Sequence, residues 1–230
     1  MLRYAVLGVI SVIAGSACAQ SAPPASPPSS SAVTIESPKP VVAMEEPKPG
    51  DHWTFETHDE ITGKISATRE NVVTEVTPTN ISVRVTIVGK PNDGLNVYDR
   101  SWNLVESPPW RFSPNDGSGI RSPLAVGKTW PVQTNNINGT NGNVWKRSGT
   151  SKVVAQETVT TKAGTFDTFK IETAFTGSNL NNPTVKNEVT SLTWYAPAID
   201  HWVKRTFVSR TNKHLLINNT FVLIEYGRGQ

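Results

Sequence analysis

The chain has 230 residues, a formal net charge of +3 at neutral pH and one cysteine. Its basic residues are scattered, with no run longer than Lys146-Arg147 or Lys204-Arg205. A nucleic-acid-binding surface needs a basic stripe, so this composition argues against a nucleic-acid partner. A lone cysteine also excludes an intramolecular disulfide.

The first residues have the pattern of a secretion signal. Arg3 gives a positive start, Tyr4 to Ile13 form an apolar run, and small residues follow up to Ala19. We therefore predict a signal peptide over residues 1–19. The apolar run is about half the length of a membrane-spanning helix, and no later stretch approaches that length, so we expect no transmembrane span in the mature protein.

The signal can be cut in two ways, which differ in what becomes of Cys18. Ala17-Cys18-Ala19 matches a small-x-small cleavage site before Gln20, which would remove the cysteine. In the alternative, Cys18 is the lipidated cysteine of a lipoprotein. Gly15 stands where lipoprotein signals usually carry a leucine, and we favour cleavage. Both routes export the protein, to the periplasm, the outer membrane or the extracellular space.

A proline-rich segment separates the signal from the rest of the chain. Residues 20–49 hold eight of the 17 prolines among Ala and Ser, and such a composition buries too little apolar surface to offset the entropy of ordering. We predict a disordered linker over 20–49. Residues 50–230 have the length of a single domain.

The domain is predicted to be all-β. Ile81, Val83, Val85 and Ile87 alternate with polar residues, which is the period of a strand with one buried face. No sustained helical pattern occurs after Gly50. Turn signals such as Asn138-Gly139 separate the runs, and Ala163-Gly164 is predicted as a two-residue hairpin loop. We expect antiparallel meanders that form a curved sheet, a half-barrel or a barrel-like sandwich.

Two stretches open in the same way and predict two similar halves, residues 50–122 and 123–230. Gly50 stands three residues before Trp53, and Gly127 stands three residues before Trp130. A paired valine follows in each half, Val72-Val73 in the first and Val153-Val154 in the second. Chance similarity is the alternative, because few positions match.

Four segments resemble a family of exported bacterial proteins known as a domain of unknown function. They are Pro123 to Trp130, Ala163 to Ile171, Trp194-Tyr195-Ala196-Pro197 and Trp202-Val203-Lys204-Arg205, with Asp200-His201 where a glycine is more usual. The resemblance covers about residues 123–226. It implies a curved antiparallel sheet, distantly like the half-barrels of lipoprotein-carrier proteins, and it implies no activity.

The residue patterns of catalysis are missing from the chain. No Gly-x-Ser-x-Gly segment surrounds a serine. His52 and His58 share the parity of one strand, but six residues span about 20 Å, too far for one metal ion. We therefore predict no catalytic residue, no metal site, no cofactor and no enzymatic activity.

Aromatic residues give the candidate contact surface. Trp102, Trp110, Arg111 and Phe112 lie in or near a proline-rich loop, and tryptophan and arginine are enriched at binding hot spots. Trp145 lies beside the asparagine-rich stretch 135–143, a combination that suits a sugar. We predict a non-enzymatic binding or scaffolding protein of the bacterial envelope, with an apolar ligand or an envelope protein as partner. The alternative is a carbohydrate-binding module that recognises a glycan.

Overall fold

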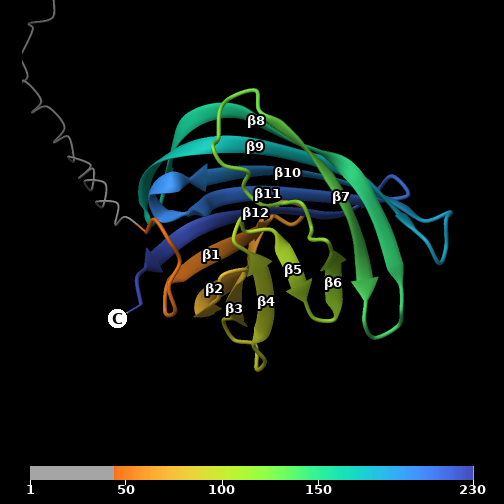
Figure 1. Ribbon diagram of the computed structural model, residues 1–230, viewed down its shortest axis with the longest axis horizontal. Coiled ribbons are helices and arrows are strands. Elements are labelled where there is room, and N and C mark those ends of the chain that lie inside the picture. The colour runs from red at the N-terminus through yellow and green to blue at the C-terminus, as the bar shows by residue number, and fades with distance from the viewer. Residues whose placement is uncertain (1–43, 230) are drawn as a thin grey trace, which may run out of the picture. The chain divides into compact units, whose positions relative to one another are not determined.

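The computed structural model describes residues Met44 to Gly229, which form one antiparallel barrel (Figure 1). Each strand pairs with its neighbours in the chain, and β1 pairs with β12 to close the barrel. The prediction of an all-β antiparallel fold is confirmed. Of the architectures expected, the structure has the closed barrel rather than an open curved sheet or a half-barrel. The twelve strands are β1 His52–Asp59, β2 Lys64–Val76, β3 Asn80–Ile87, β4 Gly94–Asp99, β5 Leu104–Ser107, β6 Trp110–Ser113, β7 Thr129–Asn138, β8 Val144–Thr161, β9 Gly164–Asn179, β10 Lys186–Ala196, β11 His201–Thr211 and β12 His214–Gly227, with a short 3-10 turn at Pro197–Ile199.

The barrel has a long wall and a short wall. Strands β8 to β12 are 11 to 18 residues long and arch over β2 to β6, of which β3 to β6 are short, with four to eight residues each (Figure 1). Strands β5 and β6 have only four residues each. The long strands therefore extend past the short wall at the end that carries the β7–β8, β9–β10 and β11–β12 hairpins.

The inner face follows the two-residue period of the sequence. In β7, every second residue from Trp130 to Asn138 is buried while most of the residues between them are exposed. In β1, Trp53, Phe55 and Thr57 are the buried set. Because alternate side chains of a strand point to opposite faces, these residues line the barrel interior.

Two loops recur at matching places in the chain. The backbone N–H of Gly50 donates to the carbonyl of Val73 at 2.8 Å, and that of Gly127 donates to the carbonyl of Val153 at 2.8 Å. Both glycines have positive φ, 89° and 92°, a conformation that glycine adopts without steric cost. Val73 of the first half therefore corresponds to Val153 of the second. The sequence had aligned Val72 with Val153, so the structural match differs from it by one residue.

Further pairs agree with this correspondence. Trp53 and Trp130 each follow the loop and are buried, and Tyr98 and Tyr195 each follow a register shift between neighbouring strands. Strands β1 to β6 and β7 to β12 then form two six-strand meanders. This arrangement is what an internal duplication predicts.

Two turns differ from their sequence interpretation. Thr161 pairs with Gly164, so the β8–β9 hairpin loop is Lys162-Ala163, one residue earlier than predicted. Gly164 has φ of 145° and begins β9. Asp200, found where a glycine is more usual, adopts the left-handed conformation with φ of 43°. Aspartate tolerates this region better than most residues, so the turn keeps the geometry that glycine would give.

The barrel includes six residues that the composition assigns to the linker. Met44 is 1% exposed, packs in the core and donates its N–H to the carbonyl of Ala198 at 2.7 Å. Asp51 is fully buried and accepts hydrogen bonds from the N–H groups of Lys48 and Gly229 and from the Arg228 guanidinium. It therefore links the beginning and the end of the chain segment that forms the barrel. The predicted signal peptide, the cleavage site at Cys18 and the rest of the linker lie outside the described residues.

Candidate functional site: a cavity inside the barrel

A cavity of about 230 Å³ lies inside the barrel. Side chains from both walls line it, so it forms only because the barrel is closed. Its apolar part is largely aromatic and comes from β1, the β4–β5 loop, β10, β11 and β12. These side chains are Phe55, Trp102, Tyr195, Trp202 and Phe221.

The aromatic side chains pack on one another in a continuous layer. The rings of Phe55 and Trp202 stack with centroids 3.9 Å apart, and Trp202 meets Phe221 edge-on at 6.2 Å. On the other side, Trp53 stacks on His201 at 4.4 Å, and Trp102 meets His201 edge-on at 4.9 Å. Such contacts hold the rings in fixed positions, so this side of the cavity is preformed.

His201 is held in its neutral form. It is 6% exposed and surrounded by aromatic rings, and its Nδ1 donates to the carbonyl of Trp202 at 3.2 Å. Burial lowers its pKa to about 3, and the positive charges of Arg205 and Arg69 act in the same direction. An imidazole with so low a pKa is a poor general base near neutral pH.

Polar side chains complete the lining of the cavity. Arg69 and Asn71 come from β2, Asn96 from β4, and Arg205 from β11. The Arg69 Nε donates to Asn71 Oδ1 at 3.0 Å, and with the Asn96 amide turned so that both of its ends are paired, the Arg69 Nη2 donates to Asn96 Oδ1 at 3.1 Å. The Arg205 Nε donates to Thr193 Oγ1 at 3.1 Å.

Asp116, from the β6–β7 loop, brings a carboxylate to the cavity. It accepts from the backbone N–H of Leu104 at 2.8 Å and from both the N–H and the hydroxyl of Ser118. Burial raises the pKa of this carboxyl, although the hydrogen bonds with Ser118 and Leu104 and the charge of Arg205 oppose the rise. The Asp116 side chain therefore already accepts hydrogen bonds that hold the β6–β7 loop in place.

A second hollow of about 530 Å³ shares Trp102, Ile120 and Tyr195 with the cavity. Residues that line both spaces stand between them, so this trio forms the partition. Asp200 fixes two of its members: it accepts from Trp102 Nε1 at 3.1 Å and from the Tyr195 hydroxyl at 2.6 Å. Burial and the neighbouring Asp200 raise the pKa of Tyr195, so the phenol keeps its proton.

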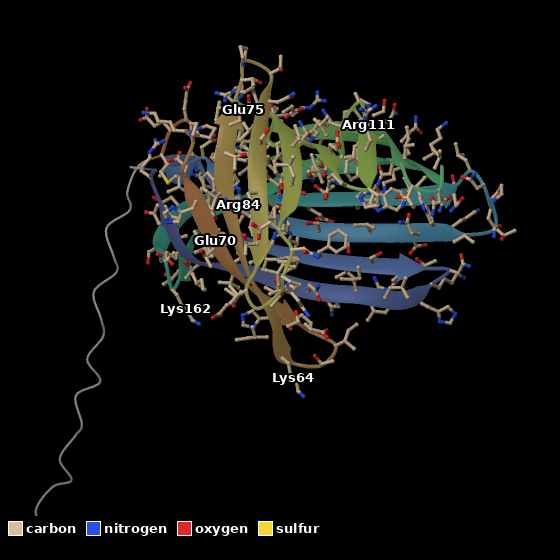
Figure 2. All side chains as sticks on the ribbon, turned by 90° about the horizontal axis from the view of Figure 1, so that it is seen from below. Lys64, Glu70, Glu75, Arg84, Arg111 and Lys162 are labelled. Atoms are coloured by element: carbon tan, nitrogen blue, oxygen red, sulfur yellow. The ribbon has the colours of Figure 1, made fainter. Side chains whose placement is uncertain are left out.

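The five residues predicted from the sequence as contacts do not form one cluster. Trp102 lines the cavity. Trp110, Arg111 and Phe112 belong to strand β6 rather than to a loop. Arg111 is exposed and lies on the outer face of the short wall with Glu70, Glu75 and Arg84 (Figure 2).

Trp110, Phe112 and Trp145 share the inner face with asparagines near the β7–β8 hairpin. Asn138 lies opposite Trp110 in the sheet, and Asn136 lies opposite both Phe112 and Trp145. Directly opposed residues of antiparallel strands project from the same face. The pairing of tryptophan with asparagine expected near Trp145 is therefore present, away from the residues that line the cavity.

The sequence analysis missed most of the polar lining. Arg69 has the same parity as Asn71 and Val73, so a charged residue on the inward face of a strand was a signal available in the sequence. The inward position of Arg205 could not be recognised from the alternation of β11. The register shift opposite Trp194 and Tyr195 changes which residues of β11 face inward. No three His, Cys, Asp or Glu side chains between Met44 and Gly229 gather in a way that could hold a metal ion.

Comparison with known proteins gives structural likeness and no sequence match. No protein-family model and no curated protein matches the chain. A candidate lipoprotein from Parabacteroides distasonis ATCC 8503 superposes with a TM-score of 0.51 at 16% identity, over 80% of this chain and 99% of that one.

Two further solved structures match at a TM-score of 0.48. One is a candidate exported protein with a YmcC-like fold from Bacteroides fragilis NCTC 9343, at 15% identity over 81% of this chain and 100% of that one. The other is the hypothetical lipoprotein YmcC from Escherichia coli, at 9% identity over 77% and 85%. The likeness to the Parabacteroides protein confirms, at the level of the fold, the resemblance to exported β-rich proteins.

In the part of the chain that the structure describes, no helix is long and apolar enough to cross a membrane.

Proposed function

We propose that this protein is a non-enzymatic binding protein of the bacterial envelope that holds a small ligand inside its barrel. The observation that carries the proposal is the cavity of about 230 Å³, which is lined by aromatic rings and by polar side chains. Preformed pockets with an apolar wall and a few placed polar groups are the usual form of a small-molecule site. This volume favours a compact ligand.

The groups around the cavity support binding without chemistry. His201 is neutral with its Nδ1 engaged by a backbone carbonyl, and the Asp116 carboxylate is occupied by the loop that carries it. Neither group is placed as a free acid or base. The arginines supply charge and hydrogen-bond donors, which are recognition elements.

Export rests on the N-terminal sequence. Arg3 and the apolar run Tyr4 to Ile13 predict a secretion signal, and the lipoprotein name of the Parabacteroides neighbour agrees with an envelope location. A barrel carried on a proline-rich segment could reach a ligand at some distance from the point of attachment.

The test is calorimetric titration with 2-naphthalenemethanol, a compact uncharged aromatic probe. Leu104 lines the cavity, and Leu104→Trp fills part of it. Leu95 is 48% exposed on the neighbouring strand β4, so Leu95→Trp adds the same bulk outside. We expect saturable binding by the wild type and by Leu95→Trp, and at least a tenfold loss in Leu104→Trp. Binding that is unchanged in Leu104→Trp would refute a cavity site.

Glycan binding is the second candidate, favoured by one arrangement. Trp145 lies opposite Asn136 and Asn179 on neighbouring strands, so an aromatic ring stands between amide groups on the inner face. An aromatic face for stacking with amides for the hydroxyls is a suitable surface for a sugar. Trp145→Ala should abolish binding of an oligosaccharide in this case and leave 2-naphthalenemethanol binding unchanged.

A further inference from the structure

We propose that the ligand of the barrel cavity carries an oxyanion, such as a carboxylate, on a flat apolar body, and that Arg69 and Arg205 bind this oxyanion. The proposal rests on the proposed function, because it names the chemical class of ligand for the same cavity. It goes further in assigning the two residues that select the ligand.

The two guanidinium groups reach the cavity from β2 and β11, which β1 and β12 separate in the barrel, and both are oriented by neutral partners. Arg69 comes from β2 and is fixed by Asn71 and Asn96, while Arg205 comes from β11 and is fixed through its Nε by Thr193. These contacts position each planar fork without neutralising it. A guanidinium held in this way keeps donors for an oxyanion in the geometry that carboxylates and phosphates match.

The charge of the two arginines is not balanced by a direct ion pair. No carboxylate among residues 44–229 comes within 4.0 Å of a nitrogen of Arg69 or Arg205. Asp116 is the acidic side chain that lines the cavity, and its oxygens already accept from Leu104 and Ser118. Burying an unpaired charge is costly, so an anion from outside would be bound favourably.

The surroundings of Arg205 show where the apolar body of the ligand would lie. The Arg205 guanidinium carbon is 4.8 Å from the centroid of the Trp202 ring, which itself stacks on Phe55. The cation therefore stands beside a layer of aromatic rings. Burial lowers the pKa of Arg205; the charges of Asp116 and Tyr98 partly oppose this, and the nearby charge of Arg69 adds to it. An anion placed between the two arginines would reduce their mutual repulsion.

The test compares 2-naphthoate with 2-naphthalenemethanol, which share the ring system and differ in charge. By calorimetry at low salt, the wild-type protein should bind 2-naphthoate at least tenfold more tightly than the alcohol, since charge-assisted hydrogen bonds are the stronger kind. Inorganic phosphate, which has the charge without the ring, should bind at least tenfold more weakly than 2-naphthoate.

The variants locate the effect. Arg205→Met and Arg69→Met should each lose about tenfold or more in affinity for 2-naphthoate and stay within about threefold of wild type for the alcohol. Arg210→Met is the matched control, because Arg210 is exposed on the same strand as Arg205. It should change neither affinity.

The outcomes separate this inference from the proposed function. Equal affinity of the wild type for 2-naphthoate and the alcohol would overturn the oxyanion site and leave cavity binding intact. Failure of both compounds to bind would overturn cavity binding, and the inference with it. Phosphate binding as tight as that of 2-naphthoate would overturn the claim that the site recognises a flat apolar body beside the oxyanion. These comparisons use wild-type protein, so they hold even where an arginine variant does not fold.

Discussion

His201 makes the stability of the barrel depend on pH, and His201→Phe should remove that dependence. The side chain is 6% exposed, stacks on Trp53 and is surrounded by the rings of Phe55, Trp102 and Trp202. Burial lowers its pKa from 6.5 to about 3. Phenylalanine keeps an aromatic ring in this place and cannot take a proton.

The sign follows from the lowered pKa. Below pH 6.5 the unfolded chain binds a proton at His201 that the folded protein does not, so stability falls as the pH falls from 6.5 toward 3. At pH 4 the difference is 6.5 minus 4, or about 2.5 pH units at about 1.4 kcal/mol each, an upper bound of about 3.5 kcal/mol. Partial titration at pH 7 and at pH 4 reduces the change between these two pH values to roughly 3 kcal/mol. At pH 7 the variant should lose only about 1 kcal/mol, the worth of the hydrogen bond to the Trp202 carbonyl.

Urea denaturation followed by tryptophan fluorescence at pH 7 and pH 4 measures both quantities. The fall in unfolding free energy between the two pH values should be smaller in His201→Phe than in the wild type by roughly 3 kcal/mol. Other titrating groups are common to both proteins and cancel in the difference. An equal fall in both would mean that His201 is protonated in the folded barrel, which would refute the closed aromatic environment.

Two further predictions concern the backbone and the ends of the barrel. Gly164 has φ of 145° where the β8–β9 hairpin returns, so Gly164→Val should destabilise the barrel by roughly 1 to 3 kcal/mol. Gly142 also has a positive φ, 68°, but it lies in an exposed turn that can rearrange in solvent, so Gly142→Val should cost less in thermal melts; equal losses would show that the hairpin does not transmit strain. Asp51→Ala should cost roughly 3 kcal/mol in urea unfolding, because it leaves the backbone N–H groups of Lys48 and Gly229 and the Arg228 charge without the fully buried carboxylate that accepts from them. A loss below about 1 kcal/mol would mean that the two ends are not joined through this carboxylate.

The strands were predictable because burial on one face imposes a period of two on the sequence. The alternating run of Ile81, Val83, Val85 and Ile87 falls in β3. Barrel closure could not be predicted from the sequence. The pairing of β1 with β12 joins segments at opposite ends of the domain, and nothing local in His52 to Asp59 specifies that partner. Long-range pairing depends on the curvature of the whole sheet.

The cavity was less predictable than the fold for two physical reasons. Register shifts change which side chains face inward, and the one at Tyr195 determines that Trp202 and Arg205 both line the cavity. Asp116 reaches the interior from a loop that has no period to follow. Trp102, predicted as a contact residue from its type and its place near the proline-rich loop, lines the cavity, whereas Trp110 and Trp145 lie on the inner face apart from the cavity lining.

The matching loops at Gly50 and Gly127 indicate why the sequence similarity between the halves is so short. Each recurring hydrogen bond needs a residue with positive φ whose N–H donates to the backbone carbonyl of a valine in the second strand after it. These requirements concern the backbone, so they determine the identity of few side chains. The lining of the cavity differs between the halves, with Arg69 from the first and Arg205 from the second. Shared backbone geometry with different inward residues is compatible with one asymmetric binding site.

Titration of nitrogen-15-labelled protein with 2-naphthoate, followed through the indole N–H signals, tests the central claim most directly. The seven tryptophans give few and well-separated signals, and Trp102 and Trp202 line the cavity while Trp110 and Trp145 do not. We expect the signals of Trp102 and Trp202 to shift saturably with the titration and those of Trp110 and Trp145 to stay in place. Shifts confined to Trp110 and Trp145, or no shift at any indole, would contradict a ligand site inside the barrel cavity.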